Sequence, residues 1–178
     1  MLRNLISAQE QFRREVHIDE DGDGQGEFGG LAELMGRPGE RGSGGMEPLL
    51  VSRKQVDAGR VMRRGYYWRL YLPRRGGGLI AERMEGGFAR GEVDPDRAEH
   101  AWYVYAWPIE EEYRGQRTFF ASGEGAMWAT QGLHGAPDGS DVEDYVADDE
   151  PAPHAADGLD WHDMGGTGRD GRVWRQTG

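Results

Sequence analysis

The chain has 178 residues, a formal net charge of −11 at pH 7, 30 glycines and no cysteine. Its length suits one domain, or one domain with an appendage. The negative charge argues against nucleic acid as a partner, because Lys and Arg must neutralise the phosphate backbone. The lack of cysteine excludes disulfides, zinc–thiolate sites, iron–sulfur clusters and cysteine nucleophiles. No run approaches the ~20 apolar residues of a membrane span, so we expect the chain as given to be soluble.

The N-terminal segment, 2–18, has the pattern of an amphipathic helix. Its polar positions, Arg3, Gln9, Arg13 and Arg14, fall away from an apolar stripe. The stripe recurs at helical spacing and consists of Leu2, Leu5, Ile6, Phe12 and Val16. We predict a helix over about 2–17, ended by the acidic, glycine-rich loop that follows.

That loop, HIDEDGDGQGEFGG at 17–30, has part of the pattern of a calcium-binding loop. Asp19, Asp21 and Asp23 alternate and Gly24 follows, which fills places one, three, five and six of the D-x-D-x-D-G frame. The twelfth place needs a bidentate carboxylate but holds Gly30. Two interpretations therefore stay open, a solvated acidic turn or a calcium site. The residues of that site would be Asp19, Asp21, Asp23, Gln25 (through its carbonyl) and Glu27.

Further along the chain, alternating aromatic and aliphatic residues predict strands. We expect short helical pieces at 31–35 and within 47–60, and strands at about 61–73, 101–109, 116–122 and 126–130, with 172–176 as a last short strand. The third and fourth strands would pair as a hairpin. Tyr66, Trp68, Leu70 and Leu72 share one strand face, which should pack around Phe12. The predicted fold is α+β, with the N-terminal helix packed on an antiparallel β-meander.

The C-terminal part, 131–178, reads as an acidic, glycine-rich, loop-rich extension of a domain over 1–130. No Lys or Arg occurs between Thr118 and Gly168, and acids crowd into 138–163, which indicates either a second cation site or a solvated loop. The histidines there, His134, His154 and His162, lack metalloprotease spacing. With neither a G-x-S-x-G elbow nor a P-loop in the sequence, we expect no enzymatic activity.

A binding module is the main alternative to a structural role. Five aromatic side chains could stack on sugar rings if they were exposed, with calcium stabilising the fold. They are Trp102, Tyr103, Tyr105, Trp107 and Trp128. The alternative function is thus an extracellular, calcium-dependent carbohydrate-binding module.

Several segments, in this order, resemble the globular part of type IV pilin-like, prepilin-type (pseudopilin-like) proteins. They are LRNLISAQEQFRREV, DGDGQGEFGGLAEL, GYYWRLYLP, VDPDRAEHAWYVYAWP and RTFFASGEGAMW. The resemblance covers roughly 1–130. It implies a helix packed on an antiparallel sheet, and a structural subunit of a type IV pilus-like or type II secretion-like filament.

The same resemblance implies other pilin-like subunits as partners and an extracellular or periplasmic location. The family's leader and the apolar half of its helix have no counterpart in this sequence. We therefore expect a membrane anchor only in a full-length precursor, and a monomer at moderate concentration for the chain as given.

Overall fold

The computed structural model describes residues 2–37, 39–42, 47–49, 56–57, 60–63, 65–83, 86–108, 117–123, 125, 127–130 and 174–177. The helices are α1 (Leu2–Arg14), α2 (Leu31–Leu34) and α3 (Pro95–Ala98). The strands are β1 (Val56–Asp57), β2 (Arg60–Arg63), β3 (Tyr66–Pro73), β4 (Leu79–Ala81), β5 (Tyr103–Pro108), β6 (Phe119–Ser122), β7 (Met127–Thr130) and β8 (Trp174–Gln176).

All eight of these strands belong to one antiparallel sheet. Its order is β1-β2-β3-β5-β6-β7-β8, and β4 pairs with β3 outside this path. The longest strand, β3, is central: it pairs with β5 over the register Tyr66↔Pro108 to Tyr71↔Tyr103. The predicted hairpin of β6 and β7 is confirmed, with Phe120 opposite Trp128. The structure therefore has the α+β arrangement predicted from the sequence, with an N-terminal helix and an antiparallel sheet.

The two faces of the sheet carry different side chains, because successive residues of a strand point to opposite sides. One face, with Trp68, Leu70 and Leu72 of β3, joins a core that also includes Phe12 of α1 and Leu34 of α2. The other face is a cluster of large rings, which we call the aromatic face. Its buried members are Tyr71, Leu79, Tyr105, Trp107, Phe120 and Trp128.

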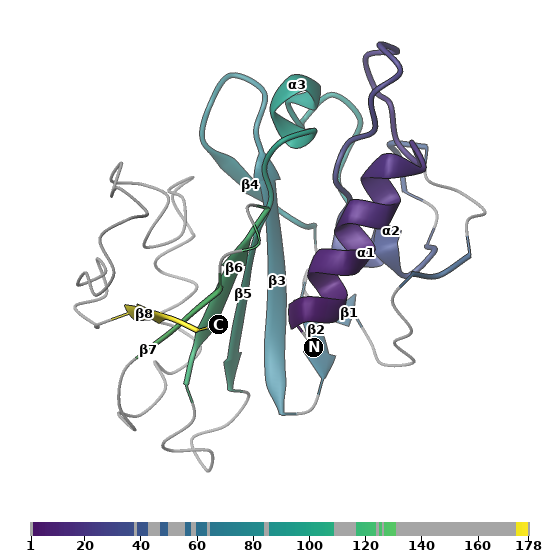
Figure 1. The fold of residues 1–178 in the computed structure, drawn as a ribbon. Helices are drawn as coiled ribbons and strands as arrows, with labels where there is room; N and C mark the ends of the chain where they lie inside the picture. The colour runs from purple at the N-terminus through teal and green to yellow at the C-terminus, as the bar shows by residue number, and fades with distance from the viewer. Residues whose placement is uncertain are drawn as a thin grey trace.

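Helix α1 lies along the first of these faces, beside β2 and β3, with α2 next to it (Figure 1). Leu5 and Phe12 are buried between the helix and the sheet. The expected packing of β3 around Phe12 is confirmed, since Phe12 shares one core cluster with Trp68, Leu70 and Leu72. Helix α3 lies at the end of β3 that leads into β4 (Figure 1).

Two details of the predicted elements need correction. Helix α1 ends at Arg14 instead of 17, because the chain turns into a left-handed conformation at Val16 (φ 52°), and that residue is 42% exposed. The strand expected at 61–73 is two strands, because Gly65 (φ 79°) makes a turn between β2 and β3. Most of 47–60, where a short helical piece was expected, lies outside the described residues; 56–57 form β1 and Arg60 begins β2.

The excursion between the first two predicted strands, 74–100, contains β4 and α3, neither of which the sequence pattern suggested. Asp94 caps α3 by accepting a hydrogen bond from the amide of Arg97, and Pro95 occupies the first turn, where its missing N–H costs nothing.

The proposed extension 131–178 lies outside the described residues except for 174–177, which include β8. Its histidines and its acidic stretch therefore lie outside them too. Among the helices described, none is long and apolar enough to cross a membrane.

Candidate functional site

The three aspartates of the loop lie together, as the sequence predicted. One carboxylate oxygen from each of Asp19, Asp21 and Asp23 lies within 4.8 Å of the other two. The loop folds back by hydrogen bonds to its own backbone: Asp19 accepts from the amides of Gly22 (2.8 Å) and Gly24 (3.1 Å). Both glycines have positive φ, at 79° and 88°, which is the conformation that such a bend requires.

The other two predicted ligands, Gln25 (through its carbonyl) and Glu27, make contacts of their own. Gln25 supports Asp23, donating to its two oxygens from the backbone amide (2.8 Å) and from the side-chain amide (2.9 Å). Glu27 turns away from the aspartates into the protein, where it accepts from the amide of Glu20 (2.6 Å) and pairs with Arg41. Glu27, which stands at the ninth place of the calcium frame, therefore anchors the loop to the rest of the protein.

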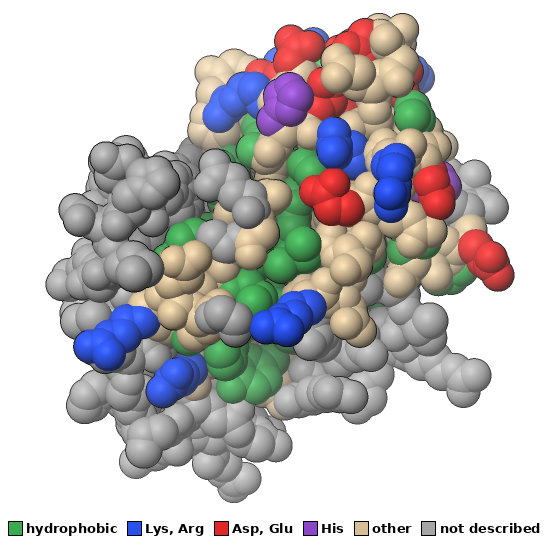
Figure 2. Space-filling model, in the orientation of Figure 1, with side chains coloured by type: hydrophobic (Ala, Val, Ile, Leu, Met, Phe, Trp, Pro, Cys, Tyr) green, Lys and Arg blue, Asp and Glu red, His purple; other side chains and the backbone are tan. Residues whose placement is uncertain are grey.

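Asp96 of α3 and Glu99, which caps the end of that helix, complete the acidic group. Oxygens of Asp21, Asp96 and Glu99 also lie within 4.8 Å of one another, so Asp21 belongs to both sets. Asp96 is exposed, whereas Glu99 is 3% exposed and lies just beneath the surface. We call the five residues Asp19, Asp21, Asp23, Asp96 and Glu99 the acidic group. Figure 2 shows acidic side chains gathered at the end of the molecule that carries α3.

The acidic group is crowded with negative charge, and the pKa values reflect this. Burial raises the pKa of Glu99, and the charges of Asp23, Asp21 and Asp96 raise it further. The amide of Asp23 lowers the pKa of Asp21, but the local loss of solvent contact and the carboxylates of Asp23 and Asp19 outweigh it, so the pKa of Asp21 is raised. Carboxylates that repel one another in this way are stabilised in their charged form by a cation.

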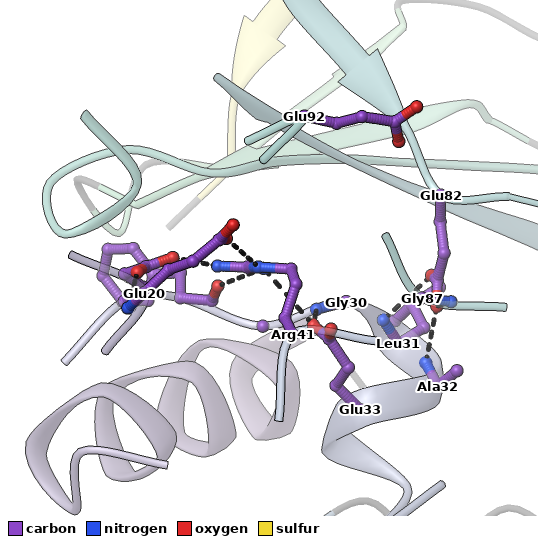
Figure 3. A network of polar contacts seen from close by, with 12 residues as sticks. Glu20, Gly30, Leu31, Ala32, Glu33, Arg41, Glu82, Gly87 and Glu92 are labelled. Carbon is purple, nitrogen blue, oxygen red and sulfur yellow. Dashed lines mark hydrogen bonds and ion pairs between the residues drawn. The ribbon is translucent and has the colours of Figure 1, made fainter. Parts of the chain in front are cut away.

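The loop is fixed to the rest of the protein by a buried ion cluster around one arginine. We call this the Arg41 cluster; its members are Glu20, Glu27, Glu33 and Arg41. The guanidinium of Arg41 lies 3.3 Å from a carboxylate oxygen of Glu20 and 3.5 Å from one of Glu33, and also pairs with Glu27 (Figure 3). One cation thus faces three carboxylates, and burial raises the pKa of both Glu27 and Glu33 more than Arg41 lowers it.

A further buried carboxylate, Glu82, holds the start of α2. It accepts hydrogen bonds from the amides of Leu31 (2.9 Å), Ala32 (2.7 Å) and Gly87 (2.8 Å) (Figure 3). The amides of Leu31 and Ala32 would otherwise lack partners at the N-terminus of α2. Burial raises the pKa of Glu82 to about 7, although the three amides oppose the shift and Glu33 adds to it.

The loop is also tied to α1 by Gln9. Its side-chain amide donates to the carbonyl of Gly29 (2.7 Å) and accepts from the amide of Gly29 (3.0 Å). Gly29 has no space for a side chain, because a Cβ there would lie 2.8 Å from Cε1 of Phe12. Gln9, which the helical pattern placed away from the apolar stripe, is therefore fully buried.

The rings considered for carbohydrate binding belong to the core. Trp102, Tyr105, Trp107 and Trp128 are 1%, 2%, 0% and 8% exposed, and Tyr103 is partly buried against the aromatic face. Phe120 packs against Tyr105 and Trp128, with ring centroids 4.9 and 5.5 Å apart. Rings packed in this way do not present a flat surface to a sugar, so the observation does not favour that alternative.

Sequence reasoning missed Asp96, Glu99 and Arg41. The first two lie more than 70 residues from the loop aspartates, and only the folding of α3 against the loop brings them near. Comparison of the chain with protein-family models, with curated proteins and with solved structures gives no match.

Proposed function

We propose that this chain is the globular domain of a non-enzymatic structural subunit in a type IV pilus-like or type II secretion-like filament. The observation that supports the proposal is the packing of α1 on one face of an antiparallel sheet, through Leu5 and Phe12. A helix held in this way presents its other side to neighbours. The partners would be other pilin-like subunits, and the location extracellular or periplasmic.

The surface of α1 is suited to contacts with copies of the same chain. Its exposed side carries Arg3, Ser7 and Arg14 with the ion pair of Glu10 and Arg13 beside them, so arginines outnumber acids there, whereas the loop that follows exposes Asp21 and Asp23. Subunits that pack head to tail need two different, complementary surfaces on each copy, and opposite charges favour such contacts. A basic helix surface and an acidic loop on one subunit meet this requirement.

Crosslinking in cells tests the proposal. The chain has no cysteine, so a cysteine introduced at Ser7 provides a single reactive position on the exposed side of α1. Gln176→Cys, also exposed but on β8, is the matched control. Each variant would replace the natural gene in its own cells. A bis-maleimide would then be applied before appendages are sheared off, and the protein would be detected by immunoblot.

We expect a crosslinked dimer from Ser7→Cys and a monomer band from Gln176→Cys, because a single thiol per subunit can be joined to only one neighbour. Monomers alone from both variants, or no protein in the sheared fraction, would contradict a filament subunit. Dimer bands of equal intensity from both variants would indicate random crowding and would also count against the proposal.

A further inference from the structure

Two groups of three carboxylate oxygens meet at the junction between the acidic loop and the C-terminal end of α3. Asp21 is shared between the loop group, with Asp19 and Asp23, and the α3 group, with Asp96 and Glu99. Carboxylate oxygens are the ligands preferred by hard divalent cations. Exposed acidic side chains often cluster without an ion, so the buried member of the set, Glu99, is the important one.

Glu99 is a buried carboxylate with an unused oxygen. Its side chain is 4% exposed, and among the described residues its Oε1 has no hydrogen-bond partner. His100 is the basic residue that pairs with it in the part of the chain that the structure describes; its Nε2 lies 3.8 Å from Oε2, and its side chain is 73% exposed. Burying a charged group without a partner is costly. The neighbours of this carboxylate in the group, Asp21 and Asp96, are themselves acidic, so a cation is the partner that the arrangement lacks.

The two segments are held in place without help from an ion. The amide of Phe28, at the end of the loop, donates to the carbonyl of Ala98 in α3 (2.8 Å). The amide of Asp94, which precedes α3, donates to the carbonyl of Pro73 at the end of β3 (3.0 Å). Glu99 follows Ala98 directly, so its carboxylate has a fixed position relative to the loop. The ligands are therefore preorganised.

We propose that a calcium ion binds at Asp21 between the acidic loop and α3, with Asp96 and Glu99 as ligands alongside the loop aspartates. The loop itself has no carboxylate at Gly30, the twelfth place of the calcium frame, and Glu27 pairs with Arg41 instead of facing the aspartates. Glu99 supplies the carboxylate that is missing from these two places. Calcium is favoured over magnesium because it accepts irregular sets of six to eight oxygens, whereas magnesium demands a near-ideal octahedron. This site does not depend on the filament proposal.

The expected affinity is modest. Asp19 and Asp23 already accept hydrogen bonds from the loop backbone, and Asp21, Asp23 and Asp96 are exposed. Sites of this kind in extracellular modules have dissociation constants of about 10⁻⁴–10⁻³ M. A cation bound at that strength stabilises the folded protein by mass action and raises its melting temperature.

Calorimetric titration with CaCl₂ and thermal unfolding in EDTA or 5 mM CaCl₂ test the site. The variants are Glu99→Gln and Asp96→Asn. The charge-matched control is Glu10→Gln, which removes an acid from a surface ion pair on α1. We expect Glu99→Gln to weaken calcium binding at least tenfold and Asp96→Asn to weaken it several-fold. The control should bind like the parent protein, and 5 mM MgCl₂ should give a smaller rise in melting temperature than calcium.

The change in melting temperature caused by Glu99→Gln distinguishes a calcium ligand from a residue with a structural role only, because its sign should differ between EDTA and calcium. In EDTA the variant should melt at the same temperature as the parent or higher, because it no longer buries an unpaired charge. In calcium it should melt lower than the parent. A parent protein that neither takes up calcium nor melts higher in it would overturn the proposal. Calcium binding that is unchanged in both Glu99→Gln and Asp96→Asn would also overturn it.

Discussion

The loop region, residues 18–42, and the aromatic face of the sheet are stabilised in different ways. The aromatic face buries rings against one another, such as Trp107 and Phe120, both 0% exposed. In the loop region, buried charges hold the backbone, and the Arg41 cluster sets one guanidinium against three carboxylates. Apolar burial depends little on pH or salt, whereas unbalanced buried charge depends on both. We therefore expect pH and cations to act on the loop region and to leave the aromatic face unchanged.

The largest expected effect is at Phe12, which joins the loop region to the sheet. Its ring is 0% exposed and packs against Gly29 on one side and the core of the sheet on the other. Phe12→Ala should lower the free energy of unfolding by about 3–5 kcal/mol, because it removes a ring and leaves a cavity. Urea denaturation followed by tryptophan fluorescence measures this. Arg3→Lys, at an exposed position of α1, should change it by less than about 0.5 kcal/mol.

A loss below about 1 kcal/mol for Phe12→Ala would mean that the loop and the sheet are stabilised independently of this ring. The two regions should then unfold in separate steps, which circular dichroism and fluorescence would report as different transition midpoints.

The next effect concerns the Arg41 cluster. Arg41→Met should cost about 3–4 kcal/mol, because it leaves Glu20, Glu27 and Glu33 buried without their cation. The loss should be larger at pH 8 than at pH 5, where the stranded carboxylates can take up protons. The matched control is Arg83→Met. Arg83 forms ion pairs with Glu40 and Glu92 but is 38% exposed, so its loss should cost less than about 1 kcal/mol. Similar losses for the two variants would show that the buried cluster is no more important than a surface pair.

The smallest effect is the pH dependence from Glu82. Its pKa is raised from 4.5 to about 7 by burial, so between these values the folded protein keeps a proton that the unfolded chain has released. Stability from this group is therefore highest below about pH 4.5 and falls as the pH rises to about 7. The charge of Glu33, which itself pairs with Arg41, raises the pKa of Glu82 as well.

Glu82→Gln isolates this contribution. The difference in unfolding free energy between variant and parent should shift in favour of the variant by about 2–3 kcal/mol between pH 5 and pH 8. Glu10→Gln, on the surface of α1, should give curves parallel to the parent. Parallel curves for Glu82→Gln would mean that this carboxylate stays charged throughout, stabilised by the amides of Leu31, Ala32 and Gly87.

The aromatic face and the loop region also differ in how much of each can be predicted from the sequence. The aromatic face arises from alternation along β3, β5 and β6, a local pattern that can be read from the chain. The helix and the convergence of Asp19, Asp21 and Asp23 are local as well. Gly65, by contrast, divides one apparent strand into two, because a turn depends on one residue and leaves little periodic signal.

The contacts that complete the loop region could not be predicted in this way. Arg41, Glu82 and Glu99 lie in segments without helical or strand periodicity, and their roles depend on which distant backbone they meet. Glu27 fits the ninth place of the calcium frame by spacing alone. In the structure Glu27 pairs with Arg41 instead, because the chain bends inward after Gly26. The backbone of Gly26 lies against the carbonyl of Arg13.

The hydrogen bonds from Leu31 and Ala32 to Glu82 span 51 and 50 residues, which has a consequence for the order in which the chain folds. Helix α2 is only four residues long and cannot be stable alone, so it needs a carboxylate that is synthesised much later. Bringing such distant segments together has an entropic cost that is offset only when the β3–β4 hairpin has placed Glu82. We therefore expect the N-terminal loop to be the last part to settle, although it leaves the ribosome first. Its contacts should then slow unfolding more than they accelerate folding.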